Sequence, residues 1–139
     1  MAGLFLEILT PSKLAFSESI KSVIVPGTKG LFQVLFNHAP LLSTLEIGTV
    51  KVEVEDKEFK YFATSGGTIE VLDNKIRILT DALEAIEDID LNRAQNALER
   101  AQKRLANKDT EKINVSRAEA ALARASNRIK AVEKYSVKN

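Results

Sequence analysis

Residues 93–105 read RAQNALERAQKRL, and residues 117–129 read RAEAALARASNRI. Seven of the thirteen positions carry the same amino acid in both stretches, and three of those seven are arginine. Apolar residues in each stretch recur at alternating spacings of three and four, which is the pattern of an amphipathic helix. The two stretches therefore predict two similar helices that follow each other in the chain.

The predicted helices are separated by the short segment Asn107-Lys108-Asp109-Thr110, which is typical of an antiparallel helical hairpin. The expected contact positions are Leu91, Ala94, Leu98, Ala101 and Leu105 in the first helix, and Val115, Ala118, Leu122, Ala125, Ile129 and Val132 in the second. Alanine buries little area, and buried apolar surface is worth roughly 25 cal/mol per Å². We therefore expect a weakly held hairpin that can undock or straighten.

An aspartate stands just before the first helix, in the run Ile89-Asp90-Leu91-Asn92-Arg93-Ala94. Asp88 or Asp90 can cap the helix by accepting a hydrogen bond from the backbone. A second interpretation makes Asp90 the acceptor for a ligand donor, such as the amino group of adenine. The residues alone leave both roles open.

Six arginines hold fixed places relative to the contact positions, and they are Arg93, Arg100, Arg104, Arg117, Arg124 and Arg128. If the helices fold back antiparallel, guanidinium groups from both can converge. Each guanidinium is a planar fork of donors that suits the oxygens of a polyphosphate or of an acidic partner protein. The alternative is that the arginines only solubilise alanine-rich helices and form i,i+4 pairs, as Glu99 and Lys103 would.

The chain before residue 85 reads as β-structure. Val50, Val52 and Val54 alternate with charged residues, which is the period of a half-buried strand. The expected strands are Leu4–Thr10, Ile20–Val25, Leu31–Phe36, 50–54, Phe59–Ala63, Ile69–Leu72 and Ile76–Thr80, with turns at Asp56-Lys57 and Asp73-Asn74 and a break at Ser65-Gly66-Gly67. The sequence thus predicts a β-sandwich over residues 1–84 and a separate antiparallel α-helical hairpin over residues 85–139.

Composition argues against several classes of function. The chain has no cysteine and a single histidine, His38, so we expect no metal site. It contains neither G-x-x-x-x-G-K-[ST] nor G-x-G-x-x-G, the two common nucleotide-binding loops. No pair of groups suited to acid–base or nucleophilic catalysis stands out, so we expect no catalytic residue. Two tyrosines, no tryptophan and a net charge of +1 give little support for nucleic-acid binding.

The distribution of charge and apolar residues bears on location and partners. Residues 85–139 carry 12 Lys+Arg against 8 Asp+Glu, whereas residues 1–84 carry 8 against 11. A basic second half fits an anionic partner without proving one. No apolar run approaches the roughly 20 residues that span a bilayer, and the first residues lack the basic start of a signal peptide. We therefore expect a protein that is made and kept in the cytoplasm.

Several short runs, taken in order and spacing, resemble the ε subunit of bacterial and chloroplast F-type ATP synthases over essentially the whole chain. These runs are Leu6–Pro11, Asn37–Leu42, Ser65–Gly67, Ile69–Val71, Glu87–Asp90, Arg93-Ala94, Arg117–Ala125 and Asn127-Arg128. The resemblance implies a β-sandwich joined to a helical hairpin. It also implies a regulatory and coupling subunit without an active site of its own.

In that family the sandwich sits on the rotor, touches the γ subunit and the ring of c subunits, and couples the catalytic head to proton flow. The hairpin folds down on the sandwich or extends along γ into the α/β head, where it restrains ATP hydrolysis. The resemblance therefore implies a peripheral protein on the cytoplasmic face of the cell membrane, or on the stromal face of a thylakoid. It requires no cofactor, and ATP is the expected regulatory ligand.

Some family members bind ATP through an Ile/Leu-Asp-x-x-Arg-Ala motif, together with an upstream acidic residue and later arginines. The residues implied here are Glu84, Ile89, Asp90, Arg93, Ala94, Arg100, Arg124 and Arg128. One departure concerns Gly30–Asn37, which replaces a glycine-rich run and changes the expected rotor contacts of that loop. The competing hypothesis is a plain interaction module whose basic hairpin grips an acidic partner and ignores nucleotides.

Overall fold

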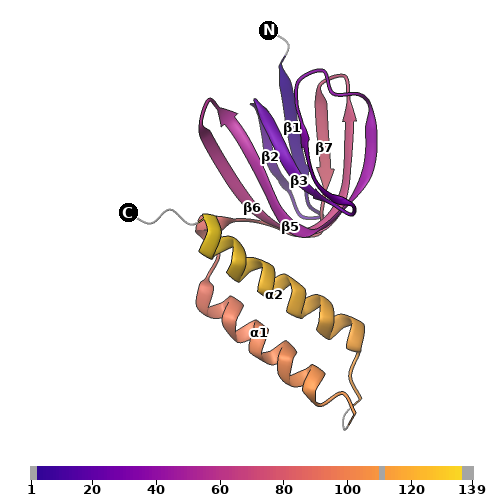
Figure 1. The fold of residues 1–139 in the computed structure, drawn as a ribbon, viewed down its shortest axis with the longest axis vertical. Helices are drawn as coiled ribbons and strands as arrows, with labels where there is room; N and C mark the ends of the chain where they lie inside the picture. Colours follow the sequence, from indigo (N-terminus) through magenta and orange to yellow (C-terminus); the bar gives the residue numbers. More distant parts are fainter. Residues whose placement is uncertain (1–2, 110–111, 136–139) are drawn as a thin grey trace. The chain divides into compact units, whose positions relative to one another are not determined.

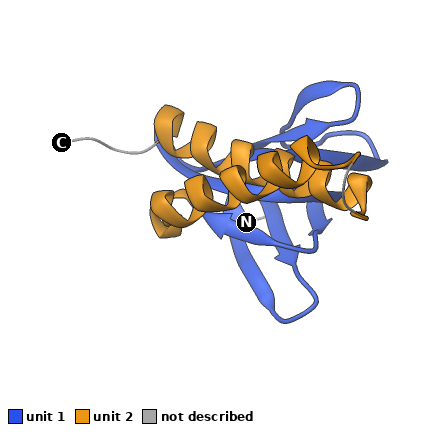
Figure 2. Cartoon of the chain, turned by 90° about the horizontal axis from the view of Figure 1, so that it is seen from below, with its two compact units in different colours: residues 1–85 blue, residues 86–139 orange. Residues whose placement is uncertain are grey.

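The computed structural model describes residues 3–109 and 112–135 of the 139-residue chain. The chain divides into two compact units, Met1–Ala85 and Ile86–Asn139, which Figure 2 separates by colour. The described part of the first unit is built from strands, and that of the second from helices. This architecture confirms the predicted β-sandwich followed by two helices.

The first unit is a sandwich of eight strands (Figure 1). They are β1 (Leu4–Leu9), β2 (Leu14–Ile20), β3 (Ser22–Gly27), β4 (Gly30–Val34), β5 (Leu41–Glu55), β6 (Glu58–Leu72), β7 (Lys75–Leu79) and β8 (Leu83–Ala85). The strand order is β2-β1-β7-β6-β5-β3-β4, and β8 pairs with β6. Neighbouring strands are antiparallel except β1 and β7, which run parallel.

Strands β5 and β6 are each 15 residues long and take part in both layers of the sandwich. Residues 41–45 of β5 pair with residues 67–71 of β6, which continue through β7 and β1 to β2. The other half of this hairpin pairs with β3 and β8, and β3 pairs with β4. One long hairpin is therefore shared by the two layers.

The long hairpin bends where glycines leave room for the backbone. Gly66 and Gly67 have φ values of +97° and +139°, and a Cβ on Gly67 would lie 1.9 Å from the carbonyl oxygen of Leu79. On the facing strand, a Cβ on Gly48 would lie 2.6 Å from a side-chain carbon of Pro26. The predicted break at Ser65-Gly66-Gly67 was wrong, because these residues bend a strand that continues on both sides.

Alternating apolar side chains from both layers fill the space between them. Val50 and Val52 are completely buried, and Val54 is nearly so, as the period-2 pattern predicted. In the sandwich, the other side chains with no exposed surface are Leu6, Ile8, Val23, Val25, Val34, Ile69, Ile76 and Ile78. This core lies wholly within the sandwich unit.

Two strands were missed, and one predicted strand was misplaced. β2 (LAFSESI) buries only Phe16 and Ile20, too few for a clear period, and β8 has three residues. The predicted strand Ile20–Val25 runs across Lys21, where β2 ends and β3 begins. The predicted turns are confirmed, since Lys57, Asp73 and Asn74 take positive φ values of 63°, 51° and 64°.

The second unit contains a short 3-10 helix, η1 (Ile86–Asp88), and the helices α1 (Leu91–Ala106) and α2 (Val115–Tyr135). α1 packs along α2, and α2 also contacts η1 (Figure 1). The buried residues of α1 and α2 are all alanines, namely Ala94, Ala101, Ala118, Ala125 and Ala131. Of the larger residues of the predicted contact, Leu91 and Val115 are exposed, and Leu98, Leu105, Leu122, Ile129 and Val132 are partly buried. The alanine-rich contact between the helices is confirmed.

Candidate functional site

The start of α1 is capped by Asp90. Its Oδ1 accepts a hydrogen bond from the backbone N–H of Arg93 at 3.1 Å, and its backbone is extended, with φ −85° and ψ 105°. This is the geometry of an N-cap. The structural role proposed for Asp90 is therefore present, and Asp88 instead ends η1. Asp90 is exposed, so its carboxylate also remains within reach of solvent.

The start of α2 repeats this arrangement 24 residues later. Oδ1 of Asn114 accepts a hydrogen bond from the backbone N–H of Arg117 at 3.0 Å. The run Ile113-Asn114-Val115-Ser116-Arg117-Ala118 is a second copy of Ile89-Asp90-x-x-Arg93-Ala94, with asparagine in place of aspartate. Reasoning from the sequence missed this copy, although extending the helical repeat by four residues would have found it.

The buried alanines fix how α1 lies against α2. Ala94 and Ala101 are seven residues apart in α1, and Ala118 and Ala125 are seven apart in α2. From this spacing we infer that, in the antiparallel pair, Ala94 lies level with Ala125 and Ala101 with Ala118. The repeat maps Ala94 onto Ala118 and Ala101 onto Ala125, so it exchanges these two levels. The hairpin therefore has an approximate twofold axis perpendicular to the plane of its helices.

This symmetry places the arginines on one face of the hairpin. A helix turns about 100° per residue. Viewed down the axis of either helix, each arginine therefore points about 80–120° away from the first buried alanine of that helix, and it is rotated in the same direction in both helices. A twofold axis perpendicular to the hairpin plane keeps both sides on the same face. We call this the arginine face, and it carries Arg93, Arg100, Arg104, Arg117, Arg124 and Arg128.

At the end of the hairpin where α1 begins, three of these arginines come together. Arg124 and Arg128 of α2 lie level with the first turn of α1, which carries Arg93 one turn after its cap at Asp90. Arg93 and Arg124 are exposed and Arg128 is half-buried. We call Asp90, Arg93, Arg124 and Arg128 the base-end cluster. It offers three guanidinium groups beside one carboxylate, an arrangement suited to an anion that also carries a donor.

The remaining predicted site residues take different positions. Arg100 lies on the arginine face about two turns along α1 from Arg93. Ala94 is buried in the helix contact, and Ile89 is half-buried. Glu84 belongs to the sandwich unit, where its backbone lies opposite Ala63 in the pairing of β8 with β6. Asp90, Arg93, Arg124 and Arg128 thus lie toward one end of the hairpin by helical geometry, whereas Arg100 lies farther along α1 and Glu84 belongs to the sandwich unit.

The atypical segment before His38 forms an ordered turn. Asn37 takes φ 65° where the resembling family has a glycine-rich run, and its backbone N–H donates to Oδ1 of Asn74 at 2.6 Å. The Asn74 amide in turn donates to Oδ1 of Asn37 at 3.0 Å. Leu35 and Phe36 just before it are half exposed. The asparagine pair therefore fixes a loop that presents apolar side chains outward.

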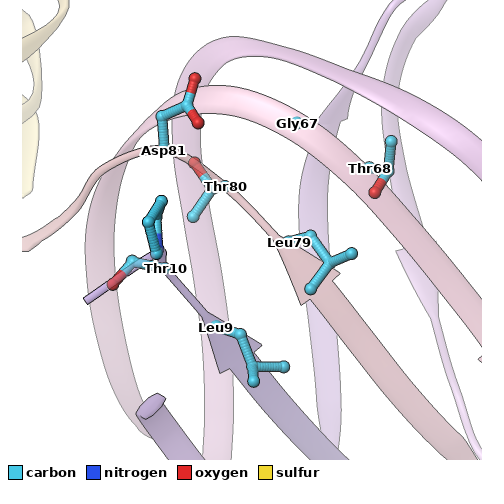
Figure 3. Close-up of a pocket in the computed structure, with 8 residues that line it drawn as sticks. Leu9, Thr10, Gly67, Thr68, Leu79, Thr80 and Asp81 are labelled. Carbon is cyan, nitrogen blue, oxygen red and sulfur yellow. The ribbon is translucent and has the colours of Figure 1, made fainter. Parts of the chain in front are cut away.

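An open pocket of about 510 Å³ lies at the bend of the sandwich (Figure 3). Its lining residues are Leu9, Thr10, Pro11, Gly67, Thr68, Leu79, Thr80 and Asp81. Asp81 is its one ionisable side chain, and the Thr80 hydroxyl bonds that of Thr64 at 3.0 Å. The lining of this pocket includes no cationic side chain and no nucleophile paired with a base.

The described residues contain no metal site. No group of three or more His, Cys, Asp or Glu side chains among residues 3–109 and 112–135 is placed to hold a metal ion. The Nδ1 of His38 lies 2.7 Å from the carbonyl oxygen of Ala39, which fits a role in its own turn. In the same described part of the chain, no helix has the length and apolar character that a membrane crossing needs.

Two family models match the chain and cover it almost completely. Residues 3–86 match the β-sandwich domain of the ATP synthase delta/epsilon chain, and residues 87–133 match its long α-helix domain. An ATP synthase epsilon chain from Desulforamulus reducens is 47% identical over 128 residues, which is 92% of this chain and 96% of that protein. One from Pelotomaculum thermopropionicum is 49% identical over 103 residues, covering 74% and 76%.

Two solved structures share the fold. A chain of the Euglena gracilis mitochondrial ATP synthase, in a structure of OSCP, F1 and c-ring, aligns with a TM-score of 0.82 at 22% identity, covering 95% of this chain and 82% of that one. A chain of the Tetrahymena thermophila mitochondrial enzyme, in a structure of the central stalk and c-ring, gives 0.59 at 17% identity, covering 94% and 97%. At these identities the similarity speaks for the fold alone.

Proposed function

Because the chain belongs to the family of ATP synthase delta/epsilon chains, as an epsilon chain, we propose that it couples the catalytic head to the rotor and restrains ATP hydrolysis. The sandwich is the rotor-binding part, and the hairpin is the regulatory part. We further propose that the hairpin binds ATP and that the subunit has no active site of its own. A proton-translocating complex is the expected setting.

The base-end cluster carries the proposal of ATP binding. Arg93, Arg124 and Arg128 supply three permanently charged forks for the phosphates, and such charge-assisted hydrogen bonds are the strong ones. The Asp90 carboxylate can accept from the adenine amino group while its Oδ1 still caps α1. A nucleotide with both an anionic chain and an amino group matches this pairing. Glu84 and Arg100 complete the proposed set.

The proposed partners are the γ subunit, the c-subunit ring and, for an extended hairpin, the α/β catalytic head. Support for a place beside the c-ring comes from the structural relatives, of which one structure is described as OSCP, F1 and c-ring and the other as central stalk and c-ring. The apolar loop before His38, fixed by Asn37 and Asn74, offers one contact surface on the sandwich. The proposed location is the cytoplasmic face of the cell membrane, or the stromal face of a thylakoid, as a peripheral part of the synthase.

The weak contact between α1 and α2 supports a hairpin that rearranges. Its buried side chains are alanines, which bury far less area than the leucines of an ordinary helix pair. A ligand that binds only the closed hairpin adds RT ln(1 + [L]/Kd), which is about 2.7 kcal/mol at 100 times Kd. That amount is large against such a contact, so ATP can decide which arrangement prevails.

Titration of the isolated chain with ATP, ADP and GTP tests the proposal. We expect one equivalent of ATP to bind and to raise the melting temperature, with GTP binding more weakly because its base presents a carbonyl where adenine has an amino group. An unchanged melting curve at millimolar ATP would favour the plain interaction module. In that case an acidic partner segment, rather than a nucleotide, would be the ligand of the arginine face.

A further inference from the structure

The arginine face extends beyond the base-end cluster, toward the end of the hairpin where α1 is connected to α2. Arg100 and Arg104 of α1 and Arg117 of α2 lie there. Arg100 is also part of the proposed ATP-binding set, whereas Arg104 and Arg117 belong neither to that set nor to the base-end cluster. We call the three arginines the turn-end cluster. We propose that the turn-end cluster is a second anion site, which binds an oligophosphate chain irrespective of any base attached to it.

The first argument is the internal repeat. A shift of 24 residues carries Arg93 onto Arg117, and the same shift carries Arg100 onto Arg124 and Arg104 onto Arg128. The approximate twofold axis therefore maps the base-end arginines onto the turn-end arginines, one for one. The caps follow the same relation, with hydrogen bonds of 3.1 Å from Arg93 to Asp90 and 3.0 Å from Arg117 to Asn114. The two ends of the hairpin hence offer the same framework of guanidinium groups.

The second argument is the spacing along the helices. Since Ala101 lies level with Ala118, Arg117 lies level with residue 102, midway between Arg100 and Arg104. At about 1.5 Å of rise per residue, the three Cα atoms fall within about 6 Å along the hairpin axis. Consecutive phosphates of an oligophosphate are only a few bonds apart. Long, exposed arginine side chains can therefore reach one such chain together from both helices.

The third argument is the charge of the surface around the cluster. Helical geometry puts Asn96, Ala97, Ala120 and Ala121 between the arginines, whereas Glu99 and Glu119 lie on other sides of their helices. Arg100, Arg104 and Arg117 are exposed, and none of them forms an ion pair with another described residue. Within α1 and α2 the positions between these arginines carry no carboxylate, and Asp109 follows in the connecting turn. Three guanidinium groups placed together attract an anion of several charges.

The caps distinguish the two ends chemically. Asp90 places a carboxylate beside the base-end arginines, whereas Asn114 places a neutral amide beside the turn-end arginines. The carboxylate repels phosphate oxygens and favours a ligand with an amino group. The amide does neither. The turn-end site is therefore expected to recognise only the phosphate chain, whereas the base-end site recognises both the phosphates and the base of a nucleotide.

The test is a calorimetric titration of the full chain with inorganic tripolyphosphate. We expect one molecule of tripolyphosphate still to bind per chain in Arg93→Ala. Its affinity should fall about tenfold or more in Arg117→Ala and in Arg104→Ala, because each removes one charge-assisted hydrogen bond. Lys103→Ala is the matched control, because it removes the same charge from the same turn of α1, on the side of the helix opposite the buried alanines. It should change the affinity less than twofold.

Asn114→Asp gives a second, independent readout. Aspartate caps a helix as well as asparagine does, so folding should not change, whereas the added carboxylate should weaken tripolyphosphate binding. Equal losses from Lys103→Ala and Arg117→Ala would overturn the proposal in favour of a diffuse positive field. Loss of all tripolyphosphate binding in Arg93→Ala, or binding only of a polyglutamate peptide, would overturn it as well. None of these outcomes depends on whether ATP binds at the base end.

Discussion

Single residues of the hairpin combine a structural and a proposed functional role in the same side chain. Asp90 caps α1 through Oδ1, and it is also the residue that the nucleotide proposal assigns to the adenine amino group. The two roles respond differently to substitution, because capping requires an oxygen whereas a tight contact with a donor benefits from the negative charge. Residue-scale experiments can therefore separate them.

Asp90→Asn should keep α1 intact and weaken ATP binding. The asparagine oxygen still accepts the bond from Arg93, as Asn114 does for Arg117 in α2, so helix content by circular dichroism should not change. Asp90→Ala should lose the cap as well, at a cost of about 0.5–2 kcal/mol in hairpin stability. Unchanged ATP affinity in Asp90→Asn would assign this residue to the cap alone.

The arginines of the base-end cluster should each matter for ATP. Arg93→Ala, Arg124→Ala and Arg128→Ala should each weaken ATP binding by about 1.5–3 kcal/mol, roughly tenfold to a hundredfold, because each removes a charge-assisted hydrogen bond. Arg117→Ala should have a much smaller effect on the ATP molecule bound at the base-end cluster, because Arg117 lies at the other end of the hairpin. Equal losses for all four in a calorimetric titration would indicate a general positive charge and no defined site.

Gly67 should be the least replaceable residue of the sandwich. In Gly67→Ala the new Cβ would lie 1.9 Å from the Leu79 carbonyl oxygen, so β6 and β7 would have to separate at the bend. We expect a loss of more than about 3 kcal/mol in the free energy of unfolding, measured with urea. Gly30→Ala is the control, because Gly30 also has a positive φ of +124° but nothing within 4 Å of the added carbon. Similar losses in both variants would assign the cost to backbone strain.

At the scale of elements, the sequence predicted most of what the structure shows. Strong periods identified the strand around Val50–Val54 and both helices, and the turns at Lys57 and Asp73-Asn74 were also correct. β2 was not predicted because only two of its seven side chains are buried, and β8 was not predicted because it is too short to show a period. The sequence also did not predict that β6 continues through Gly66 and Gly67. A glycine pair can end a strand or bend one, and the packing of the surrounding layers decides between the two.

The candidate site shows a similar limit. The residue types and the repeat pointed to arginines on both helices, but their common face depends on which residues pair across the hairpin. That pairing follows from the buried alanines of the folded chain. The second copy of the capping motif is present in the sequence, but its significance depends on knowing which residues pair across the hairpin.

Truncation after Asp88 should leave a folded sandwich. The buried core of the first unit is complete without α1 and α2, and β8 ends at Ala85. A synthase assembled with the truncated chain should couple normally and hydrolyse ATP faster, because the proposed brake is absent. Circular dichroism of the isolated fragment and ATPase assays of the complex provide the measurements. A fragment that fails to fold would show that the hairpin supports the sandwich.

At the scale of the whole molecule, the proposal is that one ligand biases a two-state hairpin. A ligand shifts such an equilibrium only by its difference in affinity for the two states, and a change from 1:99 to 99:1 needs about 5.5 kcal/mol. Only a closed hairpin brings Arg93 of α1 together with Arg124 and Arg128 of α2. ATP held by these arginines should therefore favour the closed hairpin, which we propose is the folded-down state.

Energy transfer in the assembled complex measures this shift. The chain has no cysteine, so Asp56→Cys on the sandwich and Ala123→Cys on α2 supply two unique and exposed labelling positions. We expect ATP to change the transfer efficiency, and Arg93→Ala to shift the response to higher ATP concentration. If the efficiency ignores ATP while the isolated chain still binds it, the nucleotide stabilises the hairpin without acting as a signal.

The long β5–β6 hairpin also determines how the sandwich can fold. Because its strands belong to both layers, neither layer can come apart while the other stays intact, and the sandwich should unfold in a single cooperative step. The turn at Asp56-Lys57 lets this hairpin form early from neighbouring residues. The parallel pairing of β1 with β7 joins Phe5 to Lys75 and has to wait until most of the chain is in place. Closing the sandwich is thus expected to be slow, and a nascent chain should stay unprotected against proteases until β7 has left the ribosome.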